Sequence, residues 1–81
     1  MTAWIQVGLK KTVLDPQGQA IQRALERLDY GAIAEVRQAK VFQVRVRAGS
    51  DATEAREQVE RAARDVLSNP VIEDYSIRWE E

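Results

Sequence analysis

The sequence has no cysteine and no histidine among its 81 residues. Without cysteine, the fold cannot be stabilised by a disulfide or by a thiolate-bound metal. Histidine is the usual general acid or base near neutral pH and the commonest metal ligand. The two absences leave carboxylates, lysine, serine, threonine and tyrosine for any catalysis. They narrow the possible chemistry without excluding it.

The chain also lacks an excess of charge of one sign. Twelve basic residues face thirteen acidic ones, for a formal net charge of −1. This balance argues against nucleic-acid binding, which needs a concentrated positive field, and against a polybasic membrane anchor. Apolar runs are short, and no cationic stretch precedes an apolar segment at the N-terminus. We therefore expect no membrane span, no signal peptide and a cytoplasmic location.

The length predicts one domain over residues 1–81. A chain of this size buries little more than about 60% of the surface that its unfolded form exposes, so its margin of stability is small. Because no disulfide can compensate, we expect association with other chains.

The first third of the chain predicts a strand and a helix. Residues 3–9 alternate apolar and polar positions, which is typical of a strand with one apolar face. Asp15 and Pro16 suit the start of a helix, and Gly31 suits its end in a left-handed conformation. The apolar residues between them recur at helical spacing: Ile21, Ala24, Leu25 and Leu28.

Residues 34–48 predict a hairpin. A short strand at 35–38 turns near 39–40 into a second strand at 42–46, which alternates valine and phenylalanine with glutamine and arginine. The turn has no Asn-Gly or Asp-Gly pair to mark its position.

The remaining residues predict a second helix and a last strand. Asp51 caps the helix, with Glu54 forming a loose capping box, and Asn69-Pro70 ends it. The buried stripe is expected to hold Ala52, Ala55, Val59, Ala62, Ala63 and Val66. The last strand places Tyr75, Ile77 and Trp79 on one face.

The element order is therefore βαββαβ. It predicts an α/β fold of the α+β type: a two-layer sandwich with two helices on one face of a four-stranded, mainly antiparallel sheet. The opposite face is expected to carry polar and aromatic side chains: Trp4, Gln6, Gln43, Arg45, Arg47 and Arg78. This face is either a solvated surface or a protein interface, where arginine and tryptophan are enriched.

No recognised catalytic motif occurs in the chain. Two segments are more specific than ordinary turns, namely residues 13–18 and residues 69–75. Each has a plain structural interpretation, as a helix entry in the first case and a helix exit in the second. Neither segment names a function by itself.

Taken together with a third segment, these motifs resemble the PurS family, the small subunit of phosphoribosylformylglycinamidine synthase. The resemblance rests on LDPQG at residues 14–18, VRQAK at residues 36–40 and NPVIEDY at residues 69–75. It covers nearly the whole chain. The sequence departs from the family at Lys11-Thr12 and at Ala39, where glycine is frequent in the family.

The resemblance implies a role in purine biosynthesis without an active site in this chain. It implies two partners, a glutaminase subunit (PurQ) and a synthetase subunit (PurL), which this chain bridges to support transfer of glutamine-derived ammonia to formylglycinamide ribonucleotide. ATP and Mg belong to the synthetase partner, and the chain associates with itself as a dimer or tetramer. Candidate interface residues are Lys10, Asp15, Gln17, Arg37, Lys40, Arg45, Arg47, Asn69 and Tyr75. None is assigned a catalytic, cofactor-binding or metal-binding role.

Two alternatives of other classes stay open. The chain could be a ferredoxin-like regulatory domain that binds a small anionic metabolite at a dimer interface, with Arg45 and Arg47 gripping the anion. It could also be a stand-alone enzyme that uses carboxylates or lysine, although the sequence shows no group that would activate a nucleophile.

Overall fold

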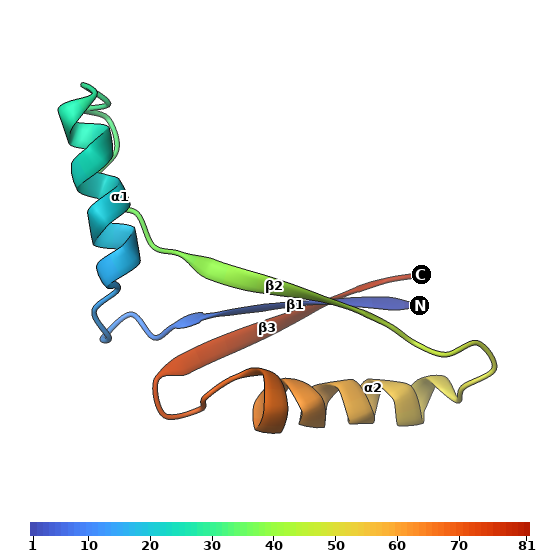
Figure 1. The fold of residues 1–81 in the computed structure, drawn as a ribbon. Helices are drawn as coiled ribbons and strands as arrows, with labels where there is room; N and C mark the ends of the chain where they lie inside the picture. The colour runs from blue at the N-terminus through green and yellow to red at the C-terminus, as the bar shows by residue number, and fades with distance from the viewer.

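The computed structural model describes residues 1–81. The elements are β1 (Thr2–Leu9), α1 (Pro16–Arg27), β2 (Ala39–Arg45), α2 (Ala52–Ala62), the π-helical turn η1 (Ala63–Leu67) and β3 (Glu73–Glu80). The strands pair in the order β2-β1-β3, and both pairings are antiparallel. The fold is α+β, with α2 lying along the sheet and α1 projecting away from it (Figure 1).

The central strand β1 supplies the middle of the core. Ala3, Ile5 and Val7 alternate along it and are almost completely buried. Ile5 lies opposite Phe42 of β2 and Ile77 of β3, so the three strands share one apolar face. The expected alternation of apolar and polar residues in this strand is confirmed.

Helix α2 covers that apolar face. Val59 and Ala63 join the three buried β1 residues in one cluster. Partly buried residues of the other elements pack around this cluster: Phe42, Val44, Leu67, Tyr75, Ile77 and Trp79. Over β3, the guanidinium of Arg56 lies 4.9 Å from the ring centre of Trp79. This flank of α2 is therefore held over β3.

The expected stripe on the second helix is only partly correct. Ala55, Val59 and Ala63 are buried, whereas Ala52 is exposed and Val66 is 78% exposed. Val66 lies in η1, and a π-helical turn takes in one residue more than an α-helical turn, which rotates the following residues away from the core. Helical structure ends at Leu67, just before the expected stop at Asn69-Pro70.

The predicted sandwich, with two helices packed on one face of the sheet, does not form within a single chain. Helix α1 leaves the sheet at the end of β1 and extends beyond it (Figure 1). Ile21 is 42% exposed and Leu28 is 67% exposed. The start of α1 is as expected, because Asp15 is the N-cap and Pro16 is the first helical residue. Its end is not, since Asp29 rather than Gly31 adopts the left-handed conformation, with φ of 67°.

The predicted hairpin is wrong, and the sheet has three strands instead of four. Residues 35–38 form no strand, and β2 starts at Ala39, where the turn was expected. Ala39 pairs with Gly8 of β1. The backbone of residues 36–38 packs against the first turn of α1, as described below, and is therefore not paired with another strand.

Candidate functional site

The base of α1 is fastened to the segment that leads into β2. The two carboxylate oxygens of Asp15 accept hydrogen bonds from different backbone groups, the N–H of Gly18 at 3.0 Å and the N–H of Gln38 at 2.7 Å. The N–H of Gln38, followed by that of Gly18, holds the pKa of the Asp15 carboxyl below its ordinary value of 3.8. One buried side chain thus caps α1 and ties it to a segment 23 residues away.

Gly18 makes the same junction close at the backbone level. A Cβ atom placed on Gly18 would lie 2.2 Å from the carbonyl oxygen of Val36 and 3.0 Å from the Cα of Arg37. No side chain fits into that space, so the helix and the 36–38 segment touch backbone to backbone. Asp15 and Gly18 of the LDPQG motif therefore have a shared role, which is to set the direction of α1.

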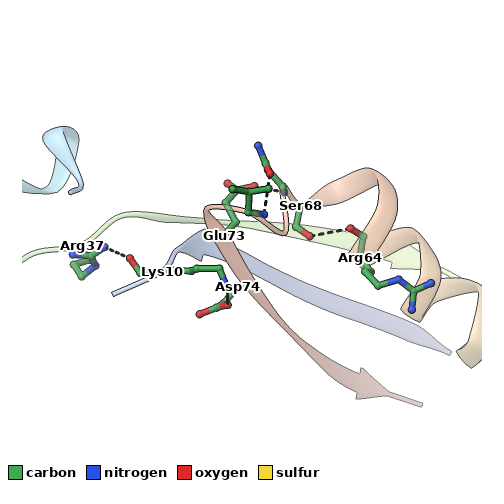
Figure 2. Close-up of polar contacts among 8 residues, drawn as sticks. Lys10, Arg37, Arg64, Ser68, Glu73 and Asp74 are labelled. Carbon is green, nitrogen blue, oxygen red and sulfur yellow. Dashed lines mark hydrogen bonds and ion pairs between the residues drawn. The ribbon is translucent and has the colours of Figure 1, made fainter. Parts of the chain in front are cut away.

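Arg37 adds a second fastening beside the first. Its guanidinium donates to the carbonyl oxygens of Lys10 at 3.0 Å and Val13 at 2.7 Å, in the turn that links β1 to α1. The Nζ of Lys10 in turn contacts the Oδ1 of Asp74 at 3.0 Å, and its backbone N–H donates to the carbonyl of Ile72. Figure 2 shows the chain of contacts from Arg37 through Lys10 to Asp74. The three family motifs, far apart in sequence, thus meet at one end of the sheet.

The NPVIEDY segment forms a compact turn at this end. The side-chain Oδ1 of Asn69 accepts from the N–H of Val71 at 3.1 Å, and the backbone N–H of Asn69 donates to the Oε1 of Glu73 at 2.7 Å. Nearby, the hydroxyl of Ser68 donates to the carbonyl of Ala63 at 2.7 Å. It also lies 3.4 Å from the carbonyl of Arg64 (Figure 2), and the two contacts close the end of η1. The turn leaves Val71 on the surface, 80% exposed.

Tyr75 belongs to the packing of α2 on β3. Its hydroxyl donates to the Oε1 of Glu60 at 2.6 Å, and this hydrogen bond raises the pKa of Tyr75 above its ordinary value of 10.0. This hydrogen bond links α2 to β3.

The structure divides the sequence-predicted residues into groups. Five of them gather at the end of the sheet where the three motifs meet, which we call the motif end: Lys10, Asp15, Gln17, Arg37 and Lys40. Three of these, Asp15, Gln17 and Lys40, line a hollow of about 200 Å³. Arg45 and Arg47 lie at the opposite end and line a larger groove of about 620 Å³ between β2 and α2. Asn69 and Tyr75 lie at the start of β3, on its turn and on its apolar face.

The open face of the sheet is largely as expected. Trp4 lies between Gln43 and Arg78 in the register of the sheet, and the guanidinium of Arg78 lies 5.9 Å from a Trp4 ring centre. The indole N–H of Trp4 is covered and has no acceptor. Arg47 is an exception, because it follows the end of β2 and is not part of the sheet.

Sequence reasoning missed the exposed apolar residues and the groove beside α2. Val66 and Val71 are more than three-quarters exposed, and Leu14 and Leu28 are about two-thirds exposed. The adjacent pair Val71-Ile72 directly after Pro70 was an available signal, because neighbouring apolar residues that are left exposed mark interaction sites.

No group of three or more histidine, cysteine, aspartate or glutamate side chains is arranged to hold a metal ion. None of the helices has the length and apolar character that crossing a membrane requires. The polar contacts described above cap helices, close turns and fasten elements, and large apolar side chains are left on the surface. These features define a small α+β domain whose exposed apolar side chains mark a surface for association with other chains.

Comparison with known proteins names the family. The model of the family described as "PurS: Phosphoribosylformylglycinamidine (FGAM) synthase" matches residues 2–81. The chain therefore belongs to the PurS family.

Individual relatives agree over nearly their whole length. The chain is 38% identical over 79 residues to the phosphoribosylformylglycinamidine synthase subunit PurS of Methanocaldococcus jannaschii, covering 98% of this chain and 94% of that one. It is 41% identical over 78 residues to the PurS subunit of Mycobacterium leprae, covering 96% and 94%. A chain in the structure of PurLQS from Thermotoga maritima superposes with a TM-score of 0.84 at 31% identity, covering 95% of this chain and 93% of that chain.

Proposed function

We propose that this chain, acting as one domain over residues 1–81, is the PurS subunit of a phosphoribosylformylglycinamidine synthase in the cytoplasm. In this role it has no active site of its own and bridges a glutaminase subunit (PurQ) and a synthetase subunit (PurL). The observation that carries the proposal is the family match over residues 2–81. The similarity to a chain in the Thermotoga maritima PurLQS structure supports the partner assignment. ATP and Mg belong to PurL in this proposal.

The physical contribution of such a subunit is proximity. Ammonia released from glutamine by one subunit is lost to water unless the second subunit lies close by, so a bridge raises its effective concentration at the acceptor. The bridge must be rigid to hold two enzymes in one arrangement. The fastening of Asp15 to Gly18 and Gln38 supplies that rigidity at the motif end.

The residues proposed to contact PurQ or PurL are those predicted from the sequence. Most of them share the motif end of the sheet, while two line the groove at the other end: Lys10, Asp15, Gln17, Arg37, Lys40, Asn69 and Tyr75 in the first group, and Arg45 and Arg47 in the second. A bridging subunit needs two separate contact regions, and the two ends of an elongated molecule provide them.

Self-association as a dimer or tetramer is part of the proposal. The radius of gyration is 16.4 Å, whereas a compact domain of this length has one of about 12 Å. Only eight of the 81 residues are buried. A chain that buries so little is stabilised when its exposed apolar side chains are covered by another copy.

The structure does not favour the alternative of a domain that binds an anionic metabolite. Arg45 and Arg47 do line the groove of about 620 Å³, but Asp51 and Glu54 line it as well. Acidic residues in the same lining weaken the positive field that an anion requires.

The function is tested with PurL and PurQ of the same organism, assayed with and without this chain. We expect synthesis with glutamine as nitrogen source to fall at least about tenfold without the chain, because diffusing ammonia is diluted. Synthesis with saturating ammonium chloride is expected to change by less than about twofold, because that reaction needs no transfer between subunits.

The control is PurL alone with ammonium chloride, which reports the synthetase without any bridge. If the chain changes neither activity, or if the purified chain converts substrate by itself, the proposed function is wrong.

A further inference from the structure

Helix α1 and the segment that returns from it to the sheet form a unit, residues 14–38, which we call the α1 arm. Asp15 and Gly18 hold the helix against residues 36–38, so the two halves of the arm are fastened to each other. The arm extends away from the sheet (Figure 1). The contacts of Asp15 and Gly18 fix the direction of α1 relative to residues 36–38, and the angle of the whole arm to the sheet is set elsewhere.

Two stretches of chain connect the arm to the sheet. One is the turn that follows Leu9 at the end of β1, and the other is the step from Gln38 to Ala39, where β2 begins. Gly8, one residue before the end of β1, lies opposite Ala39 in the sheet, so the two connections lie side by side. Such a pair of neighbouring connections is a hinge, about which the arm can rotate as one body.

Arg37 makes the only polar contacts that cross this hinge. Its Nη2 donates to the carbonyl oxygens of Lys10 at 3.0 Å and Val13 at 2.7 Å. No other residue of the arm shares a hydrogen bond or an ion pair with the rest of the chain. Lys10 is in turn joined to β3 and the turn before it, through Asp74 and the carbonyl of Ile72 (Figure 2). One guanidinium thus connects the arm to the sheet.

The angle of the arm matters because the arm is long. Helix α1 has 12 residues and is therefore about 18 Å long, so a rotation of about 10° at its base moves its far end by about 3 Å. A misplacement of about 1 Å that originates far from the reacting groups can lower a rate by about 100-fold. A bridge with a freely rotating arm would not hold two enzymes in one arrangement.

We infer that Arg37 is a positioning residue for ammonia transfer, because it fixes the angle of the α1 arm and so the arrangement of the subunits that the chain bridges. Arg37 acts through the backbone of Lys10 and Val13, and for this residue that role replaces the direct contact with PurL or PurQ predicted from the sequence. The inference rests on the proposed function and deepens it. Its signature is a loss of transfer without a loss of binding.

Distances within one chain give the first test. Because the chain has no cysteine, Arg27→Cys at the end of α1 and Glu57→Cys on α2 carry the only two spin labels. Double electron–electron resonance is recorded with an excess of unlabelled chain, so that only distances within a chain contribute. Arg37→Met keeps the length of the side chain and removes its donors, and it is expected to broaden the distance distribution at least about twofold.

The assembled complex with PurL and PurQ gives the second test. In Arg37→Met, product formed per glutamine hydrolysed is expected to fall at least about threefold, because released ammonia escapes to water. The concentration of the chain that gives half-maximal activity is expected to change by less than about twofold, because no contact with a partner is removed.

Two further variants make the comparison specific. Arg37→Lys keeps a charged donor beside the two carbonyls and is expected to recover part of the transfer and part of the narrow distribution. The matched control is Arg23→Met, which removes an exposed guanidinium without hydrogen bonds from the same arm and is expected to equal the wild type in both measurements. Far-UV circular dichroism checks folding, and Arg37→Lys serves as the test variant if Arg37→Met is unfolded.

A distance distribution for Arg37→Met as narrow as that of the wild type would overturn the inference. A broad distribution with undiminished transfer would also overturn it, because the angle of the arm would then be irrelevant to the reaction. Failure of the proposed function looks different: the wild-type chain would not raise the product per glutamine above that of PurL and PurQ alone. The inference would then fail with it, even where the distances change as expected.

Discussion

At the scale of single residues, Asp15 and Gly18 decide how the chain leaves the sheet. Asp15 is a helix cap whose second oxygen binds the N–H of Gln38, so a local feature also makes a long-range connection. Gly18 allows the helix to approach the Val36 carbonyl more closely than any side chain permits. A cap and a glycine in the first turn of a helix are common, and their combination here orients the whole of α1.

Gly18→Ala is the sharpest test at this scale. The added methyl group would meet the backbone at 2.2 Å from the Val36 oxygen, so we expect a loss of stability of about 1–3 kcal/mol from overpacking. Chemical denaturation measures the loss. The matched control is Gly31→Ala, where a Cβ meets nothing within 4 Å, and which is expected to be neutral or slightly stabilising. Equal effects of the two substitutions would show that the junction at Gly18 is not tight in solution.

At the scale of elements, the two helices differ in what holds them. Helix α2 packs on the sheet through Val59 and Ala63. Helix α1 has 12 residues and buries only Gly18, and helices shorter than about 12–15 residues are marginal in water without packing. Within its own chain, α1 is held mainly at its first turn, by Asp15 and by the contact of Gly18 with residues 36–38.

Hydrogen exchange tests this difference. In dilute protein, amides of α1 are expected to exchange orders of magnitude faster than those of Ile5 and Val7 in β1, because α1 can open without unfolding the core. If the proposed self-association covers the exposed Ile21 and Leu28, exchange in α1 is expected to slow markedly at high protein concentration. Equal protection of α1 and β1 in the dilute monomer would mean that α1 is stable by itself.

At the scale of the whole molecule, the shape is the main observation. The Cα trace extends over 52 × 26 × 13 Å, which is long and thin for 81 residues. Such a form exposes most of its surface, and the folded state of one copy has little stability in reserve. Folding and association are then linked, because a partner that binds only the folded chain stabilises it.

This linkage predicts unfolding that depends on concentration. For a dimer, each tenfold rise in protein concentration adds about 1.4 kcal/mol at the midpoint, which corresponds to an increase in Tm of about 4 °C for two chains of this size. Thermal scans from 1 to 100 µM are therefore expected to differ by about 8 °C in all. A wild-type Tm that does not move would contradict self-association.

Local sequence signals predicted much of the structure. The alternation in β1 and β3, the cap at Asp15, the first helical proline and the stripe of Ala55, Val59 and Ala63 are all confirmed. Each depends on neighbours within one turn or one strand, which periodicity reports directly. The three motifs were also recognisable, although their meeting at one end of the sheet was not.

The amino-acid sequence by itself determined the helices, the three strands apart from the early start of β2, the family and the absence of cysteine and histidine chemistry. Only the tertiary structure decided that α1 projects from the sheet, that residues 35–38 are no strand and that a groove opens beside α2. The physical reason is that these features depend on contacts between distant residues, such as Asp15 with Gln38 and Gly18 with Val36. An amphipathic helix shows in its sequence that one side must be covered, but not which surface covers it.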